Sequence, residues 1–90
     1  MIIVSQDKKK IINFERITEI TARGTKILVR DDIFLPEGEE IATYETEERA
    51  KEVLQEIWNF YENAKRYECS NNNGMTIFFE TKFTYEMPNK

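Results

Sequence analysis

Side-chain types that commonly carry out catalysis are sparse in this chain. Histidine is absent from the 90 residues, which excludes Ser-His-Asp and Cys-His catalysis and any histidine-ligated metal site. Cys69 is the one cysteine, so no disulfide can form within the chain, as is usual in a reducing, cytoplasmic compartment. The bases near it in the sequence are carboxylates such as Glu68, which disfavour a reactive thiolate. We therefore expect a protein that is not an enzyme, with no catalytic, cofactor-binding or metal-binding residue.

Phosphate and metal sites have no recognisable motif. The three glycines, Gly24, Gly38 and Gly74, belong to neither a GxGxxG nor a GxxxxGK[ST] loop. The carboxylates between positions 31 and 40 lack the ordered spacing of a calcium loop. A bulge at Asp31 and Asp32, followed by an acidic turn, accounts for them.

Arginine could still hold an anionic ligand without a glycine-rich loop. Arg16, Arg23 and Arg30 recur at a spacing of seven, and an aromatic ring could stack on a base beside them. This spacing does not place them on one strand face, and a solvated surface is the ordinary interpretation. The alternative function is a sequestering protein that holds a small nucleotide signal between subunits.

Three aromatic residues are hard to assign to the core. Trp58 lies at the edge of the apolar helix stripe described below, Phe34 lies next to the turn that begins at Pro36, and Phe78 falls on the polar face of the last strand. Aromatic side chains of this kind anchor protein–protein interfaces. We predict an interaction surface at these residues, with an extension of the core as the open alternative, particularly for Trp58.

The charge balance argues against a nucleic-acid binder. Acidic residues outnumber basic ones, 17 to 13, and the isoelectric point is about 4.9, whereas binders of DNA or RNA present a positive surface. The acidic residues between 37 and 48 leave mimicry of nucleic acid open. The longest apolar run, residues 1–4, is far too short for a membrane span. No repeat or linker divides the chain, so 1–90 is expected to be one domain.

Strand patterns fill the first half of the chain. We expect strands at 2–4 and 10–14 around a lysine-rich hairpin tip, then a kink at Glu15 and Arg16 and a strand to about residue 23. A turn at Gly24 leads to a strand from 25 to 30, extended to 35 if a bulge occurs at the aspartates. The motif at 36–39 predicts the next turn, and 40–45 the returning strand.

A single long helix is the clearest element. Thr46 is placed to cap a helix over about 46–66, because a hydroxyl can accept an orphan amide hydrogen bond. Apolar residues then recur at spacings of three and four. They are Ala50, Val53, Leu54, Ile57, Tyr61 and Ala64. Apolar and polar residues alternate from 75 to 87, which predicts a long C-terminal strand that ends at Pro88.

These elements predict an α+β fold. We expect a curved antiparallel sheet of five to six strands, with the one amphipathic helix packed across it and the long strand last. One helix can cover only one face of the sheet. A second copy of the chain could cover the other face, so we expect a homodimer.

Three short segments resemble a family. They are 4–9 (VSQDKK), 44–54 (YETEERAKEVL) and 85–88 (YEMP), and they are similar to small uncharacterised proteins of Firmicutes and their phages and prophages. The resemblance implies no catalytic residue. It implies instead an accessory protein that binds a host or phage protein and inhibits a host defence component. The expected function is thus a non-enzymatic, cytoplasmic binding protein.

Overall fold

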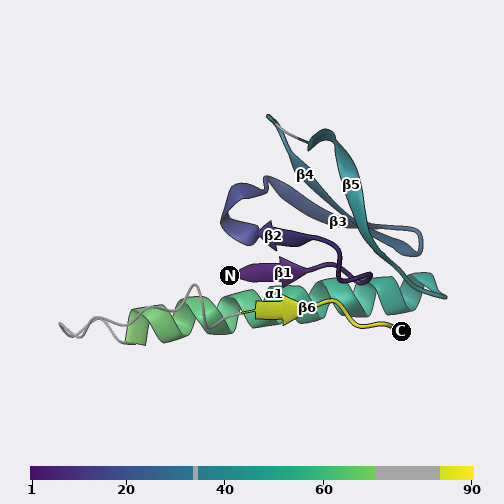
Figure 1. Cartoon of the computed structure of the whole chain (residues 1–90). Helices are drawn as coiled ribbons and strands as arrows, with labels where there is room; N and C mark the ends of the chain where they lie inside the picture. Colours follow the sequence, from purple (N-terminus) through teal and green to yellow (C-terminus); the bar gives the residue numbers. More distant parts are fainter. Residues whose placement is uncertain (34, 71–83) are drawn as a thin grey trace.

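The structure is a computed structural model that describes residues 1–33, 35–70 and 84–90, with only the backbone described for 64–70. Five strands precede the helix α1 in the described chain, and the strand β6 follows it (Figure 1). The elements are β1 (Ile2–Val4), β2 (Ile11–Asn13), the 3-10 helix η1 (Phe14–Arg16), β3 (Glu19–Arg23), β4 (Lys26–Asp31), β5 (Leu35–Thr43), α1 (Glu47–Ser70) and β6 (Thr84–Glu86). The predicted α+β class is confirmed.

The predicted single antiparallel sheet is wrong. The strands form two three-stranded sheets, ordered β2-β1-β6 and β3-β4-β5. In the first sheet β1 pairs antiparallel with β2 but parallel with β6, so that sheet is mixed. The parallel pair is possible because the chain between β1 and β6 includes the long helix, and a crossover of that length can return a strand in the same direction. Between β2 and β3, η1 interrupts the pairing and separates the two sheets.

The lysine-rich hairpin tip is confirmed and is organised by two side chains. The Ser5 hydroxyl donates to Asp7 Oδ1 at 2.6 Å and accepts from the Lys10 amide at 3.1 Å. The Lys9 amide donates to the same Asp7 oxygen. The bond from Ser5, and then that from Lys9, hold the pKa of Asp7 below its usual value. Lys8 lies at the apex with φ 64°, a left-handed conformation that occurs mainly at tight turns.

The chain reverses earlier than predicted after β4. The turn lies at Asp32 and Ile33, where the Asp31 carboxylate accepts a hydrogen bond from the Ile33 amide at 2.8 Å. Such a local side-chain bond competes with a continuing strand. The turn predicted at 36–39 is therefore wrong, since this segment is part of β5. Gly38 retains a positive φ of 90° inside that strand, and the pairing with β4 shifts register at two places.

The helix begins as predicted and ends later. Thr46 caps it, because the Arg49 amide donates to Thr46 Oγ1 at 3.1 Å. The expected end near residue 66 is wrong, since α1 continues to Ser70. Within the stripe, Ala50, Val53 and Ile57 are buried, while Leu54 and Tyr61 are half-buried at its edges. The inner face of the helix is thus the predicted one.

The core joins the helix to both sheets. Ile3 of β1, Ile27 and Val29 of β4, and Met87 after β6 are buried with the helix stripe in one cluster. The predicted C-terminal strand over 75–87 lies mostly outside the described residues, as do Met75, Ile77, Phe78, Phe79 and Phe83. Of its described part, Thr84–Glu86 is strand and pairs with β1.

Gln6 connects the N-terminal hairpin to β5 and to the C-terminal segment. Its backbone amide donates to the Ile41 carbonyl at 2.9 Å. Its side-chain oxygen accepts from the Thr43 amide, and its Nε2 donates to the carbonyls of Thr43, Pro88 and Asn89 at 2.9–3.2 Å. The side chain thus substitutes for a strand residue where the two sheets meet.

We expect Gln6→Ala to lower the free energy of unfolding by about 1–2 kcal/mol, because several hydrogen bonds to backbone groups are lost together. Amide hydrogen exchange should quicken at Thr43 and in residues 87–90 before it quickens in α1. Lys9→Ala, in the same loop but with no side-chain hydrogen bond among the described residues, is the matched control. Equal exchange in the two variants would show that Gln6 does not hold these segments together.

Candidate functional site

One exposed aromatic cluster lies along α1. Trp58 is 54% exposed, as its position at the edge of the helix stripe predicts. Its ring centroid lies 6.3 Å from that of Tyr61, which in turn lies 4.9 Å from Phe14 of η1. We call Phe14, Trp58 and Tyr61 the Trp58 cluster. It joins the helix to the N-terminal hairpin and leaves half of the indole open to a second surface.

The helix extends well past the strands. Figure 1 shows the C-terminal part of α1 projecting beyond the end of β1 and β6. A helix backbone that reaches beyond its own sheet has no strand of the described chain to pack against there.

Of the other two predicted interaction residues, Phe34 and Phe78, neither is among the residues that the structure describes. Two exposed aliphatic side chains, Ile33 and Ile11, are further candidates for an interaction surface. Ile33 at the β4–β5 turn is 79% exposed, and Ile11 of β2 is 75% exposed. Sequence reasoning missed both, because each is an aliphatic residue within an apolar pair or run of an expected strand. An edge-strand assignment for 11–13 would have identified Ile11.

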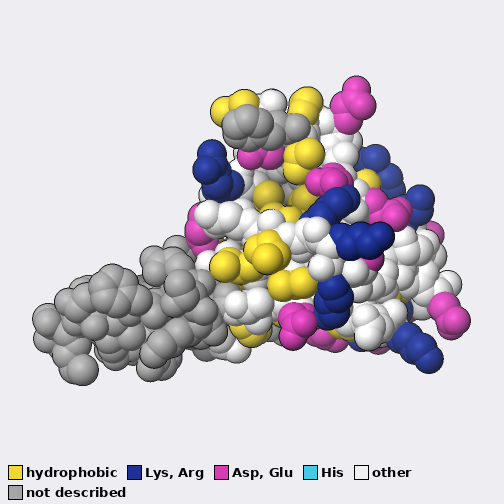
Figure 2. Space-filling view, in the orientation of Figure 1, with side chains coloured by type: hydrophobic (Ala, Val, Ile, Leu, Met, Phe, Trp, Pro, Cys, Tyr) yellow, Lys and Arg dark blue, Asp and Glu magenta, His cyan; other side chains and the backbone are white. Residues whose placement is uncertain are grey.

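Ile11 lines a groove between β2 and the upper part of the β4–β5 hairpin. The groove has a volume of about 380 Å³ and is formed by nine residues. These are Lys10, Ile11, Ile12, Asn13, Arg16, Ile17, Asp31, Leu35 and Glu39, which we call the β2–β5 groove. Figure 2 shows hydrophobic side chains in the hollow between these elements, with acidic and basic side chains around it.

The charged side chains around the groove differ in whether they already have a partner among the described residues. Lys10 forms an ion pair with Glu39 across the groove, and this hydrogen bond raises the pKa of Lys10 above its usual value. Asp31 accepts the amide hydrogen bond that forms the β4–β5 turn. Arg16 makes no ion pair with any residue that the structure describes. It is therefore the cation of the groove that is free to meet a ligand.

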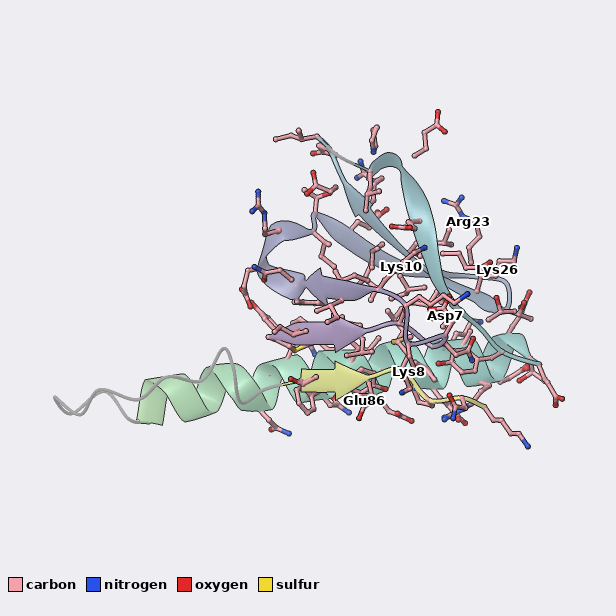
Figure 3. All side chains as sticks on the ribbon, viewed as in Figure 1. Asp7, Lys8, Lys10, Arg23, Lys26 and Glu86 are labelled. Carbon is pink, nitrogen blue, oxygen red and sulfur yellow. The ribbon has the colours of Figure 1, made fainter. Side chains whose placement is uncertain are left out.

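The three predicted arginines do not converge on one site. Arg16 lines the β2–β5 groove, whereas Arg23 and Arg30 both border a small depression of about 20 Å³ on the β3–β4–β5 sheet. Arg30 is bound to Glu19 at 3.3 Å and to Asp32 at 2.6 Å. Figure 3 shows Arg23 near Lys26 at the β3–β4 turn, whereas Arg30 pairs at the far end of β3.

A larger hollow, of about 560 Å³, lies where β5 enters α1 and is bordered by the last residues of the chain. The cation that borders this hollow, Arg49, already forms ion pairs. Arg49 pairs with Glu52 and Glu56 at 3.1 Å and donates two hydrogen bonds to the Lys90 carbonyl. Its guanidinium also lies 5.8 Å from the Tyr44 ring centroid. This network holds the C-terminal segment on α1 and leaves little capacity for an anionic ligand.

Two phenols, the buried Tyr44 and the half-buried Tyr85, complete that network. Tyr44 donates a hydrogen bond to the Pro88 carbonyl at 2.9 Å, and Tyr85 donates to Glu56 Oε1 at 3.0 Å. Burial raises the pKa of Tyr44 to about 12. Burial, together with the Glu56 carboxylate, also raises the pKa of Tyr85. Both groups remain neutral hydrogen-bond donors at physiological pH and serve to anchor the chain.

Two further kinds of feature are absent from the described part of the chain. No group of three His, Cys, Asp or Glu side chains there could hold a metal ion. No helix there combines the length and apolar character needed to cross a bilayer.

Comparison with known proteins gives no match. No family model, no curated protein and no solved structure matches this chain. The resemblance of 4–9, 44–54 and 85–88 to phage and prophage proteins therefore stays a prediction. The function must be argued from the Trp58 cluster and the β2–β5 groove.

Proposed function

We propose that this chain is a non-enzymatic binding protein that assembles as a homodimer through the Trp58 cluster and acts on another protein in the cytoplasm. The observation that carries the proposal is the half-exposed indole of Trp58, beside Tyr61 on a helix that extends past its own strands. Aromatic anchors of this kind concentrate binding free energy at interfaces. In a dimer whose two-fold axis lies beside α1, each subunit would cover the Trp58 of its partner.

The exposed area of the Trp58 indole is large enough to contribute substantially to the free energy of dimerisation. A tryptophan side chain buries 150–250 Å², and about half of Trp58 remains to be covered. At about 25 cal/mol per Å², covering roughly 100 Å² contributes about 2–3 kcal/mol per subunit. Tryptophan also carries a ring N–H that can find an acceptor in a partner.

The resemblance to phage and prophage proteins supports the choice of partner. An accessory protein of that kind would bind a host defence protein and block it, which requires a surface but no catalytic residue. The acidic segment 37–48 supplies further charged surface, and its mimicry of nucleic acid is one way to occupy a basic partner.

A second candidate function has its own observation. Arg16 and Arg23 form no ion pair with the described residues, so both can meet an anion, and Arg16 lies in a groove that is large enough for a small molecule. The chain could then sequester a small nucleotide signal, with Arg16, Arg23 and Arg30 brought together only between subunits. Native mass spectrometry of the purified protein distinguishes the two functions, because a retained nucleotide adds mass and ultraviolet absorbance.

Trp58→Ala tests the proposed dimer. We expect the dimer dissociation constant to rise about thirtyfold or more, equivalent to at least 2 kcal/mol, with little loss of monomer stability. Sedimentation and thermal melting over a hundredfold range of concentration measure both quantities. Lys51→Ala, at another exposed position of α1, is the matched control and should leave assembly unchanged.

If Trp58 belongs to the hydrophobic core of the monomer, a different result is expected for Trp58→Ala. Thermal stability would then fall equally at every protein concentration, because no association is involved. An unchanged sedimentation profile with such a loss would refute the interface role.

A further inference from the structure

We propose that the β2–β5 groove binds an extended peptide segment of a partner protein, which adds to the free edge of β2 and places an acidic side chain beside Arg16. The proposal names the partner chemistry for the binding role above. It rests on that role, but not on the dimer, because the groove shares no residue with the Trp58 cluster.

The backbone of β2 faces the groove with unpaired groups. Lys10 and Phe14 direct their backbone groups toward β1, since the Lys10 carbonyl accepts from Ser5 and the Phe14 amide donates to Met1. Alternation along an antiparallel strand then turns the amide and carbonyl groups of Ile11 and Asn13 away from β1. The sheet order leaves β2 at the edge, and nothing in the described chain pairs with these groups. An edge of this kind is a template for strand addition.

Apolar side chains border the same edge. Ile11 is 75% exposed, although an edge strand is normally protected by charged residues or proline. Ile17 and Leu35 are half-buried and line the groove with it. A peptide that places every second side chain against these residues would bury apolar surface while its backbone pairs with β2.

The charges select a peptide rather than a nucleotide. Arg16 is the free cation, whereas Lys10 is neutralised by Glu39 and the carboxylate of Asp31 also borders the groove. With Lys10 and Glu39 paired, Arg16 is the one unpaired cation among the described lining residues, which is too little positive charge for a diphosphate, and none of those residues offers an aromatic ring to stack on a base. One arginine with five N–H donors suits a single carboxylate. An acidic residue within an otherwise apolar, alternating strand meets these requirements.

An array of immobilised seven-residue peptides provides the probe. One set alternates valine or isoleucine with polar residues and carries one glutamate, and a second set has the same compositions in scrambled order. We expect the full-length protein to prefer the alternating set. With the tightest alternating peptide in solution, the amide resonances of Ile11 and Asn13 should shift and exchange more slowly with solvent.

Variants of the chain assign the binding to the groove. Arg16→Gln should weaken binding of the glutamate peptide about tenfold and leave a glutamine version of that peptide unaffected. Ile11→Pro should abolish binding, because it removes an outward N–H without removing a bond to β1, while Ile11→Thr keeps that N–H and should weaken binding only several-fold. Circular dichroism melting checks that each variant folds.

Two outcomes would overturn the proposal. One is an equal signal from alternating and scrambled peptides, and the other is Arg16-dependent binding of ADP without any peptide binding. Repeating the titration with Trp58→Ala separates the two inferences. Peptide binding should persist in that variant whether or not the dimer forms.

Discussion

Replacing Ile57 by alanine should lower the free energy of unfolding by about 2–5 kcal/mol. Ile57 is 1% exposed and lies at the centre of the helix stripe, in the cluster that contains Ile3, Ile27 and Met87 from three other segments. The loss combines the transfer free energy of the removed methyl groups with the cavity that the rigid surroundings cannot fill. Domains of this size have a total stability of roughly 5–10 kcal/mol, so this loss removes a large part of it and raises the unfolded fraction of the variant.

Urea denaturation measures this effect through the midpoint, with the slope as a check on two-state behaviour. Ile57→Val is a graded control and should cost about 0.5–1.5 kcal/mol. Gln55→Ala, at an exposed position on the same helix, should shift the midpoint little. A midpoint for Ile57→Ala equal to that of Gln55→Ala would show that this face of α1 does not pack on the sheets.

Alkaline pH should destabilise the protein through the phenols of Tyr44, which is buried, and Tyr85, which is half-buried. The pKa of Tyr44 is raised by burial to about 12, and that of Tyr85 is raised as well, whereas a tyrosine in the unfolded chain ionises near 10. The folded state therefore retains protons that the unfolded state releases. The stabilisation is complete below pH 10 and is lost as the pH rises from 10 through the folded-state pKa.

For Tyr44, 5% exposed, the two-unit difference in pKa corresponds to about 3 kcal/mol, lost between pH 10 and 12. Urea denaturation at pH 8, 10 and 11 measures the loss, and absorbance near 295 nm follows ionisation directly. Tyr44→Phe should be less stable at pH 8, because the bond to Pro88 is lost, but its stability should fall less steeply above pH 10.

Lysines also titrate in this range, and the Lys10–Glu39 pair is one example. They are present in every variant, so the difference between wild type and Tyr44→Phe isolates the phenol. Tyr61→Phe serves as a second control, since Tyr61 lies in the partly exposed Trp58 cluster. Parallel stability curves for wild type and Tyr44→Phe above pH 10 would contradict the prediction.

Features set by neighbours in the sequence could be predicted. The Thr46 cap, the buried helix face, the turn at Gly24 and the hairpin tip at 5–10 all depend on groups within a few residues of one another. The half-exposure of Trp58 followed from the helix period, because its angle from the stripe is fixed by its position alone. The absence of histidine likewise excluded whole classes of catalysis without any structure.

The pairing of distant segments was decided only by the tertiary structure. Alternation identified the strands, but it did not show that β1 lies between β2 and a parallel β6, nor that β4 and β5 turn at Asp32 instead of at Pro36. The β2–β5 groove follows from that pairing, since the free edge of β2 and the position of Arg16 beside it arise only once two separate sheets have formed. A side-chain pattern records which face a strand buries, whereas its hydrogen-bond partner is chosen by which long-range contacts bury the most apolar surface together.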